Sequence, residues 1–370
     1  MAAEHSIFSL SLGRHLSLPE KLECAAEAGF KGFELYFDDF FNFAASYTPS
    51  AHSAFPPSSS IQRAEQELLA AAYIRDLCAS LGLEIICFQP LRDFEGWRYR
   101  SAESLRKRRE AQWVLSIARE LGTDLLCLAS NVQPRFSPSM AGPSRAEWER
   151  QAVEDLRWIA DEASREEYRL DDGRGMRVAF ESLAWGAYSY TTAQAWSLVS
   201  RADRPNLGLI LDSFNALARE WADPTSRYSG GRLPNGPRSL QRLTDLISSL
   251  PAEKIFLLQL ADANLPLPHL QKEFEDVNLT PSLLLRWSRT SRLFPLESER
   301  GAYLPVVEFT KAVHKTGFRG MWSVEVFNEI LDDESAWGRP LATRGFESLR
   351  KLEKAVEEAQ WKGDMVRATL

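Results

Sequence analysis

Short β-rich runs alternate with longer amphipathic segments along this chain, and this alternation restricts the possible folds more than any other feature. Each segment between the runs places its apolar residues at helical spacing. Eight β-rich runs occur, at residues 6–12, 32–37, 83–89, 124–129, 177–182, 207–212, 254–262 and 321–327. Strands that alternate with helices form parallel sheets, because each helix returns the chain to the end of the sheet where the previous strand began.

Residues at the expected helix ends support this division. Ser17 and Glu20 form a capping-box pattern with Pro19 in the first turn, and Gly29 follows the same helix just before the next strand. Eight strand–helix units in succession predict a (β/α)8 TIM barrel, with residues 1–370 as one domain. A doubly wound open sheet is the alternative, but no GxGxxG motif follows the first strand.

Charge and cysteine usage exclude some classes of partner and compartment. The net charge of −7 gives no electrostatic support for a nucleic-acid partner, which normally meets a basic surface. No apolar run approaches the roughly 18 residues needed to cross a membrane, and the first residues lack a signal-peptide pattern. The four cysteines occur singly, as in a reducing compartment. We therefore expect a cytoplasmic protein without a membrane partner.

Four consecutive strands, the fifth to the eighth, carry an oxygen-bearing side chain at or near their ends. These residues are Glu181, Asp212, Gln259 and Glu325. A single carboxylate at a strand end is more often a helix cap or an ion-pair partner, but the ends of parallel barrel strands meet at one rim, where like charges would repel. A divalent cation relieves that repulsion. Three carboxylates and an amide suit Mg²⁺, Mn²⁺ or Co²⁺, whereas Zn²⁺ usually recruits His or Cys.

Two connections are longer than a turn between strand and helix requires. Residues 131–145 are rich in Pro and Ser, which predicts a surface excursion after the fourth strand. The second connection is a long loop insertion after the seventh strand, at residues 263–304, with both aromatic and charged residues. Because loops after barrel strands build active sites, we interpret it as a lid. The alternative is a packing or oligomer-contact insertion, so a homo-oligomer stays possible.

Several segments, spread over about residues 6–350, carry a resemblance to a known family. They are SLSLGR, GFELYFDD, CFQPLRDFEGW, FESLAWG, LQLADA and SVEVFN, and the most specific are RLFPLESERGAYLP and LDSFN. Together they resemble the 3-dehydroshikimate dehydratases of quinate catabolism. These belong to the sugar phosphate isomerase/epimerase-like, or xylose isomerase-like, barrel superfamily.

The resemblance implies a metal-dependent dehydration of a small molecule, 3-dehydroshikimate, to protocatechuate. The family's metal ligands match Glu181, Asp212, Gln259 and Glu325 of this chain. Removing a proton next to a ketone creates an enolate, whose charge a divalent ion stabilises. Loss of the β-hydroxyl group and tautomerisation then produce an aromatic ring.

The carboxylate of such a substrate needs a cationic partner. Arg92 follows the third strand at the expected active-site rim and could bind a carboxylate in a bidentate manner. It could equally pair with Asp93 or Glu95 at the surface. Arg289 and Arg292, in the insertion after the seventh strand, are the other candidates.

The general base is less apparent from the sequence. Asn215 stands in LDSFN where related bacterial sequences have His, and an Asn cannot accept a proton at neutral pH, although fungal members resemble this chain. His269 could approach the site with the lid as an acid or base; an exposed loop residue is the alternative. Glu34, on the second strand, could act as the base or could simply pair with Arg14. A metal-bound carboxylate is a further candidate.

Other functions share part of this evidence. A sugar or hydroxypyruvate isomerase would use the same metal and the same enolisation, and would differ in its product. A barrel nuclease would need several His ligands and a basic face, and the chain has only five histidines. A non-catalytic barrel that binds a metabolite would bind ligand without turnover.

Overall fold

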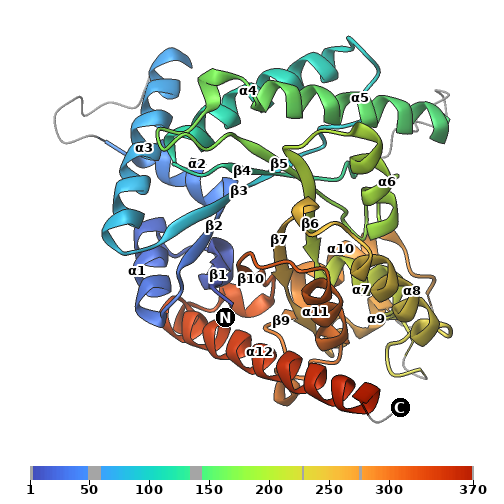
Figure 1. Cartoon of the computed structure of the whole chain (residues 1–370). Helices are drawn as coiled ribbons and strands as arrows, with labels where there is room; N and C mark the ends of the chain where they lie inside the picture. Colours follow the sequence, from blue (N-terminus) through green and yellow to red (C-terminus); the bar gives the residue numbers. More distant parts are fainter. Residues whose placement is uncertain (1–2, 49–59, 134–143, 227–228, 275–276, 369–370) are drawn as a thin grey trace.

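A computed structural model of the chain describes residues 3–48, 60–133, 144–226, 229–274 and 277–368. Eight parallel strands close into a barrel in the order β1-β10-β7-β6-β5-β4-β3-β2, and helices surround it (Figure 1). The strands are β1 His5–Phe8, β2 Gly32–Tyr36, β3 Glu84–Arg92, β4 Leu125–Ala129, β5 Arg177–Glu181, β6 Leu207–Asp212, β7 Ile255–Leu260 and β10 Trp322–Val324. All eight predicted strands are present, so the predicted (β/α)8 barrel is confirmed.

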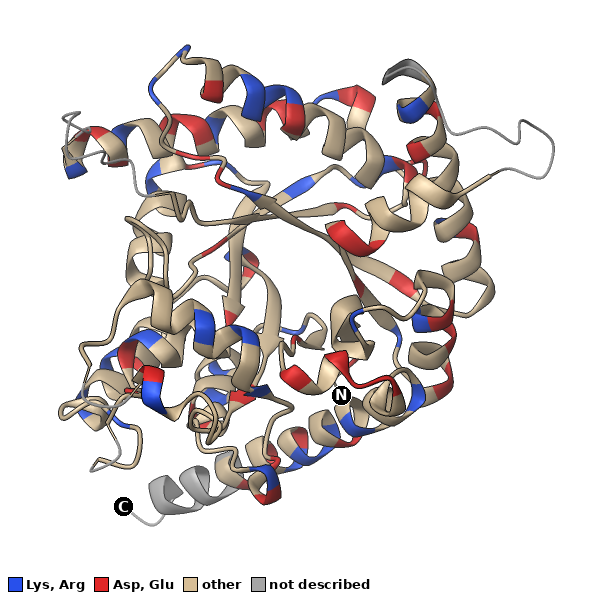
Figure 2. Cartoon of the chain, turned by 180° about the vertical axis from the view of Figure 1, so that it is seen from behind, with Lys and Arg blue, Asp and Glu red and all other residues tan. Residues whose placement is uncertain are grey.

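Helices follow the strands along the chain and cover the outside of the barrel (Figure 1). Their bounds are α1 Leu18–Ala28, α2 Phe37–Ser46, α3 Ser60–Ser80, α4 Ala102–Glu120, α5 Arg145–Ala163, α6 Thr192–Ala202, α7 Ser213–Glu220, α8 Gly236–Ser248, α9 Gln271–Phe274, α10 Pro281–Ser291, α11 Val306–Lys315 and α12 Arg339–Ala368. The capping box predicted at the start of α1 forms, with Ser17 accepting from the backbone of Glu20. Acidic and basic residues intersperse along the outer helices rather than separating by sign in the view of Figure 2.

One local prediction was wrong, and one helix was not predicted. The first strand ends at Phe8, and residues Ser9–Leu12 form a 3-10 helix. The Ser9 hydroxyl accepts from the backbone of Tyr36 and donates to Asp39, so a tertiary contact replaces strand pairing. Helix α2 begins directly after β2 in an aromatic run that the sequence pattern did not mark as helical.

The segment between β7 and α11 is not a simple loop. It contains α9, α10 and two short strands, β8 Asp262–Ala263 and β9 Arg292–Leu293, which pair in antiparallel fashion beside the barrel. The Asp262 carboxylate accepts backbone N–H groups of Ala263, Tyr303 and Leu304 within 2.9 Å. This carboxylate ties both ends of the segment to the end of β7, so the segment is anchored there rather than free.

The excursion predicted at residues 131–145 lies mostly outside the described residues. Among the residues that are described, no helix combines the length and apolar character needed to span a membrane.

Candidate metal and substrate site

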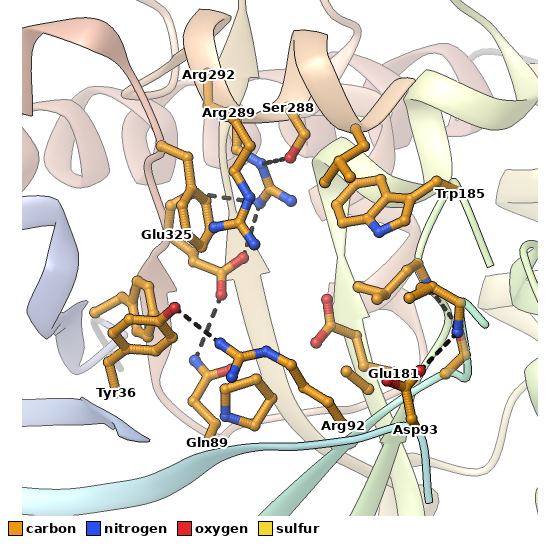
Figure 3. A pocket seen from close by; sticks show the side chains of 18 residues that line it. Tyr36, Gln89, Arg92, Asp93, Glu181, Trp185, Ser288, Arg289, Arg292 and Glu325 are labelled. Carbon is orange, nitrogen blue, oxygen red and sulfur yellow. Dashed lines mark hydrogen bonds and ion pairs between the residues drawn. The ribbon is translucent and has the colours of Figure 1, made fainter. Parts of the chain in front are cut away.

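A cavity of about 160 Å³ opens where the barrel strands end (Figure 3). Phe8, Tyr36, Trp185 and Phe327 provide much of its apolar wall. A buried cavity of roughly 150 Å³ can hold a six-membered ring such as benzene. The carboxyl ends of the strands are where barrel enzymes bind their substrates, so this cavity is the candidate site.

Three buried carboxylates converge beside the cavity, and two of them, Glu181 and Glu325, line it. Oxygen atoms of Glu181, Asp212 and Glu325 all lie within 4.8 Å of one another, and each residue is at most 4% exposed. Glu181 ends β5, Asp212 ends β6, and Glu325 directly follows β10. Parallel strands in register deliver these side chains to one rim. The described part of the chain thus contains a buried acidic triad able to hold a metal ion.

Gln259, on β7, places its amide in the same layer. Its Nε2 atom donates to Oε2 of Glu34 over 2.8 Å, and it lies 3.5 Å from Oε1 of Glu325. The amide oxygen is buried and has no hydrogen-bond partner among the described residues. A buried acceptor without a partner is costly, so this oxygen suits a metal ligand. All four predicted ligand residues therefore come together.

Burial governs the protonation of these groups. Burial and the neighbouring charge of Asp212 raise the pKa of Glu181 to about 8. Burial raises the pKa of Glu34 to about 7, against hydrogen bonds that favour its charged form. Burial also raises the pKa of Glu325, and Arg292 acts against that rise. A cation bound among these oxygens would favour their charged forms.

Arg292 lines the cavity, but its guanidinium group already pairs with two carboxylates. Its Nη1 atom lies 2.8 Å from both Asp212 Oδ2 and Glu325 Oε2. Nε donates to Ser288, and the residue is only 1% exposed. Burial alone would lower the pKa of Arg292, but Asp212 and Glu325 together raise it. The sequence offered Arg292 as a substrate-binding residue, whereas the structure turns its guanidinium group towards the acidic triad.

Arg289 also lines the cavity, three residues earlier and in a different environment. Its guanidinium group lies 4.6 Å from the centre of the Phe327 ring. Within the described residues no carboxylate comes within ion-pair distance of it, and burial lowers its pKa. Figure 3 shows Arg289 reaching into the cavity from the side opposite Arg92.

Arg92 is more exposed than the other two arginines. It donates to the hydroxyl group of Tyr36 over 2.8 Å and lies 3.6 Å from Asp38. The pairing with Asp93 or Glu95 considered from the sequence is not formed. Asp93 accepts from the backbone of Val132, and Glu95 from that of Asn131.

Asn215 lies between two members of the acidic triad. Its Nδ2 atom donates to Glu181 over 2.8 Å and to Asp212 over 2.7 Å. Its Oδ1 atom accepts from the backbone of Ala184. Both polar atoms of the Asn215 side chain are thus hydrogen-bonded. These contacts indicate that Asn215 holds the two carboxylates in place.

The other two base candidates do not line the cavity. His269 is mostly exposed and lies 3.1 Å from Glu329 on the outer surface. Glu34 is fully buried beneath the cavity and accepts from the side-chain amides of Gln89 and Gln259. The pairing of Glu34 with Arg14 is not formed, because Arg14 pairs with Asp332.

The sequence reasoning missed several cavity residues. Tyr36 ends β2, and Gln89 lies near the end of β3. The search for oxygen-bearing side chains at or near strand ends, which found the acidic residues, could therefore have found both. Ser288 lies one helical turn before Arg292. Residues at this spacing lie on the same face of a helix, so Ser288 could have been expected beside Arg292. Trp185, in the connection after β5, gives no such signal.

Comparisons with known proteins agree with this geometry. Residues 22–352 match a family model described as "Xylose isomerase-like TIM barrel". A 3-dehydroshikimate dehydratase of Neurospora crassa is 33% identical over 361 residues, which cover 95% of this chain and 94% of that protein. One of Pseudomonas aeruginosa is 35% identical over 96% of this chain, but this chain spans only 42% of it.

A solved structure gives the same result. A xylose isomerase-like TIM barrel/4-hydroxyphenylpyruvate dioxygenase fusion protein is 30% identical to this chain, with a TM-score of 0.70. The match covers 98% of this chain and 45% of the fusion protein. The chain is thus similar to the barrel-sized part of a longer protein in this case, and to nearly the whole of the Neurospora protein.

Proposed function

The chain belongs to the xylose isomerase-like TIM barrel family and, within it, to the 3-dehydroshikimate dehydratases, and from this premise we propose that it converts 3-dehydroshikimate to protocatechuate with a divalent metal ion. The observation that carries the proposal is one cavity that faces both a buried acidic triad and an arginine without a carboxylate partner among the described residues.

The proposed metal ligands are the three carboxylates of the triad and the amide oxygen of Gln259. This set of oxygen donors favours a hard ion such as Mg²⁺ or Mn²⁺, with Co²⁺ as a further candidate. When bound, the ion supplies electrostatic stabilisation for negative charge that develops on the ketone oxygen of the substrate. Asn215 holds Glu181 and Asp212 at the spacing this requires.

Arg289 is the residue we assign to the substrate carboxylate. It reaches into the cavity, it is already partly buried, and no carboxylate of the described chain neutralises it. Charge-assisted hydrogen bonds are stronger than those between neutral groups. Arg92 lies closer to solvent and can assist from the opposite wall.

The reaction removes a proton next to the ketone and then expels the β-hydroxyl group as water, which leaves an aromatic ring after tautomerisation. Of the base candidates, Glu34 and His269 do not line the cavity, whereas Glu181 and Glu325 do. We therefore assign the proton transfer to a carboxylate of the cavity wall. A carboxylate must be unprotonated to accept that proton, and a cation bound beside it favours this charged form.

The test is a product assay after removal of metal. The full chain is treated with a chelator, supplied with 3-dehydroshikimate, and given MgCl2, MnCl2 or CoCl2 in turn while the ultraviolet absorbance of protocatechuate is followed. We expect no product before metal addition and product afterwards. A His269→Ala variant is the matched control, because its side chain lies outside the cavity and it should keep the parent rate.

A protein that binds metal but forms no protocatechuate with any of the three ions would contradict the proposal. Conversion of a keto sugar or hydroxypyruvate to its isomer would then identify the other enolising activity of this fold.

A further inference from the structure

Arg292 is the most completely buried cation at the site, and the backbone on both sides of it is fixed. Its own N–H donates to the carbonyl of Phe327, and its carbonyl accepts from the side chain of Asn328. The guanidinium group lies 4.4 Å from the centre of the Phe214 ring and 5.1 Å from that of Phe327. This side chain is therefore a built-in part of the site.

The guanidinium group of Arg292 lies against two carboxylates of the acidic triad. Its Nη1 atom contacts one oxygen of Asp212 and one of Glu325, each at 2.8 Å, and leaves the second oxygen of each carboxylate uncontacted by arginine. Three carboxylates within 4.8 Å of one another repel if nothing positive intervenes. Arg292 and a divalent ion together supply as many positive charges as the triad has negative ones.

Arg292 is a poor candidate for binding the substrate. A substrate carboxylate could recruit it only by competing with two buried carboxylates, and breaking a buried pair leaves an uncompensated charge. Arg289, which lines the same cavity, requires no such exchange because no described carboxylate pairs with it. The two arginines of one segment thus have different roles.

We propose that Arg292 is a permanent counter-charge of the metal site. While no metal ion is bound, Arg292 stabilises the folded arrangement of the acidic triad. Once an ion is bound, Arg292 and the ion together neutralise the three carboxylates. This inference rests on the metal site of the proposed function. It implies that the metal-free protein depends on Arg292 more than the metal-loaded protein does.

The test compares thermal unfolding of the parent protein, Arg292→Met and Arg289→Met, each as the full chain, with EDTA or with MnCl2. In EDTA, Arg292→Met should melt roughly 5–10 °C below the parent. In MnCl2 that difference should shrink to less than about half, because the ion then supplies counter-charge. Arg289→Met is the matched control, and its melting temperature should stay near that of the parent in both conditions.

The outcomes separate this inference from the proposed function. If MnCl2 fails to stabilise even the parent protein, the metal site is wrong and the role of Arg292 with it. If MnCl2 stabilises the parent but the deficit of Arg292→Met is equal in both conditions, or grows, Arg292 is a structural ion pair or a positioning group and the inference is overturned.

A variant that does not fold would still be informative. Arg292→Met that is purified in MnCl2 and unfolds on chelation meets the expectation. If it fails to fold even with MnCl2, Arg292→Lys replaces it, since lysine keeps the charge without the planar fork. Its smaller deficit should again shrink on adding MnCl2, and a deficit that does not shrink overturns the inference.

Discussion

The side-chain nitrogen of Gln259 donates to Oε2 of Glu34 over 2.8 Å, and the same nitrogen lies 3.5 Å from Oε1 of Glu325 in the acidic triad. With the nitrogen committed to Glu34, the oxygen is the atom left for a metal ion. Glu34 also accepts from Gln89, so two amides depend on one buried carboxylate. Groups that orient a metal ligand through a hydrogen bond commonly affect the metal affinity of the site.

Replacing Glu34 with Ala should therefore weaken Mn²⁺ binding by roughly 10- to 100-fold, because the amide of Gln259 loses the acceptor that orients it. Titration calorimetry measures the change. Glu34→Gln is the matched variant, since its amide oxygen can still accept from Gln259, and its loss should be smaller. Unchanged affinity in Glu34→Ala would contradict the orienting role.

Glu181→Ala and Glu325→Ala should each lose bound metal and activity while the barrel still folds. Both side chains belong to the acidic triad, and neither contributes to the apolar core. Metal content by elemental analysis, circular dichroism and the protocatechuate assay check the three expectations. Metal-dependent turnover retained by both variants would rule out these ligands.

Asn215→Ala should lower kcat while both limbs of the pH–rate profile remain. The side chain donates to Glu181 and Asp212 and has no titratable group, so its loss disturbs positions rather than removing a base. Steady-state kinetics between pH 6 and 9 measure both effects. Disappearance of one limb of the profile would instead assign proton transfer to this position.

Arg289→Met should raise KM for 3-dehydroshikimate by roughly 10- to 100-fold, the range expected for losing a hydrogen bond to a charged group. Arg92→Met, nearer to solvent and already bonded to Tyr36, should have the smaller effect. Equal KM values for the parent and Arg289→Met would move the substrate carboxylate elsewhere.

In the metal-free protein, the contribution of Glu181 to the stability of the fold should depend on pH. Burial raises its pKa from 4.5 to about 8, so the folded protein binds this proton more tightly than the unfolded chain does. The resulting stability is complete below the unfolded pKa and is lost as pH rises through the folded pKa. Glu181→Gln, which resembles the protonated form, should match the parent near pH 4 in EDTA and exceed its melting temperature at pH 8.5. Parallel melting curves across this range would contradict the shifted pKa.

The local pattern of the sequence was enough to predict the barrel and its acidic rim. Strand periodicity and helix caps are properties of neighbouring residues, and parallel strands deliver their ends to one rim whatever the loops do. Glu181, Asp212, Gln259 and Glu325 were therefore predictable as a group before any coordinates. The same rule would also have found Gln89, which ends the strand expected at residues 83–89.

The division of labour among the arginines could be decided only by the tertiary structure. Arg292 reaches Asp212, 80 residues away in the chain, because the β8–β9 pairing and the Phe327 carbonyl fix its backbone. Arg289, three positions earlier, emerges in the cavity without a described carboxylate partner. The tertiary structure likewise turned Asn215 towards two carboxylates and left His269 outside. Sequence spacing specifies which residues a segment carries, but side-chain direction and partner depend on how distant segments pack, and no local pattern encodes that packing.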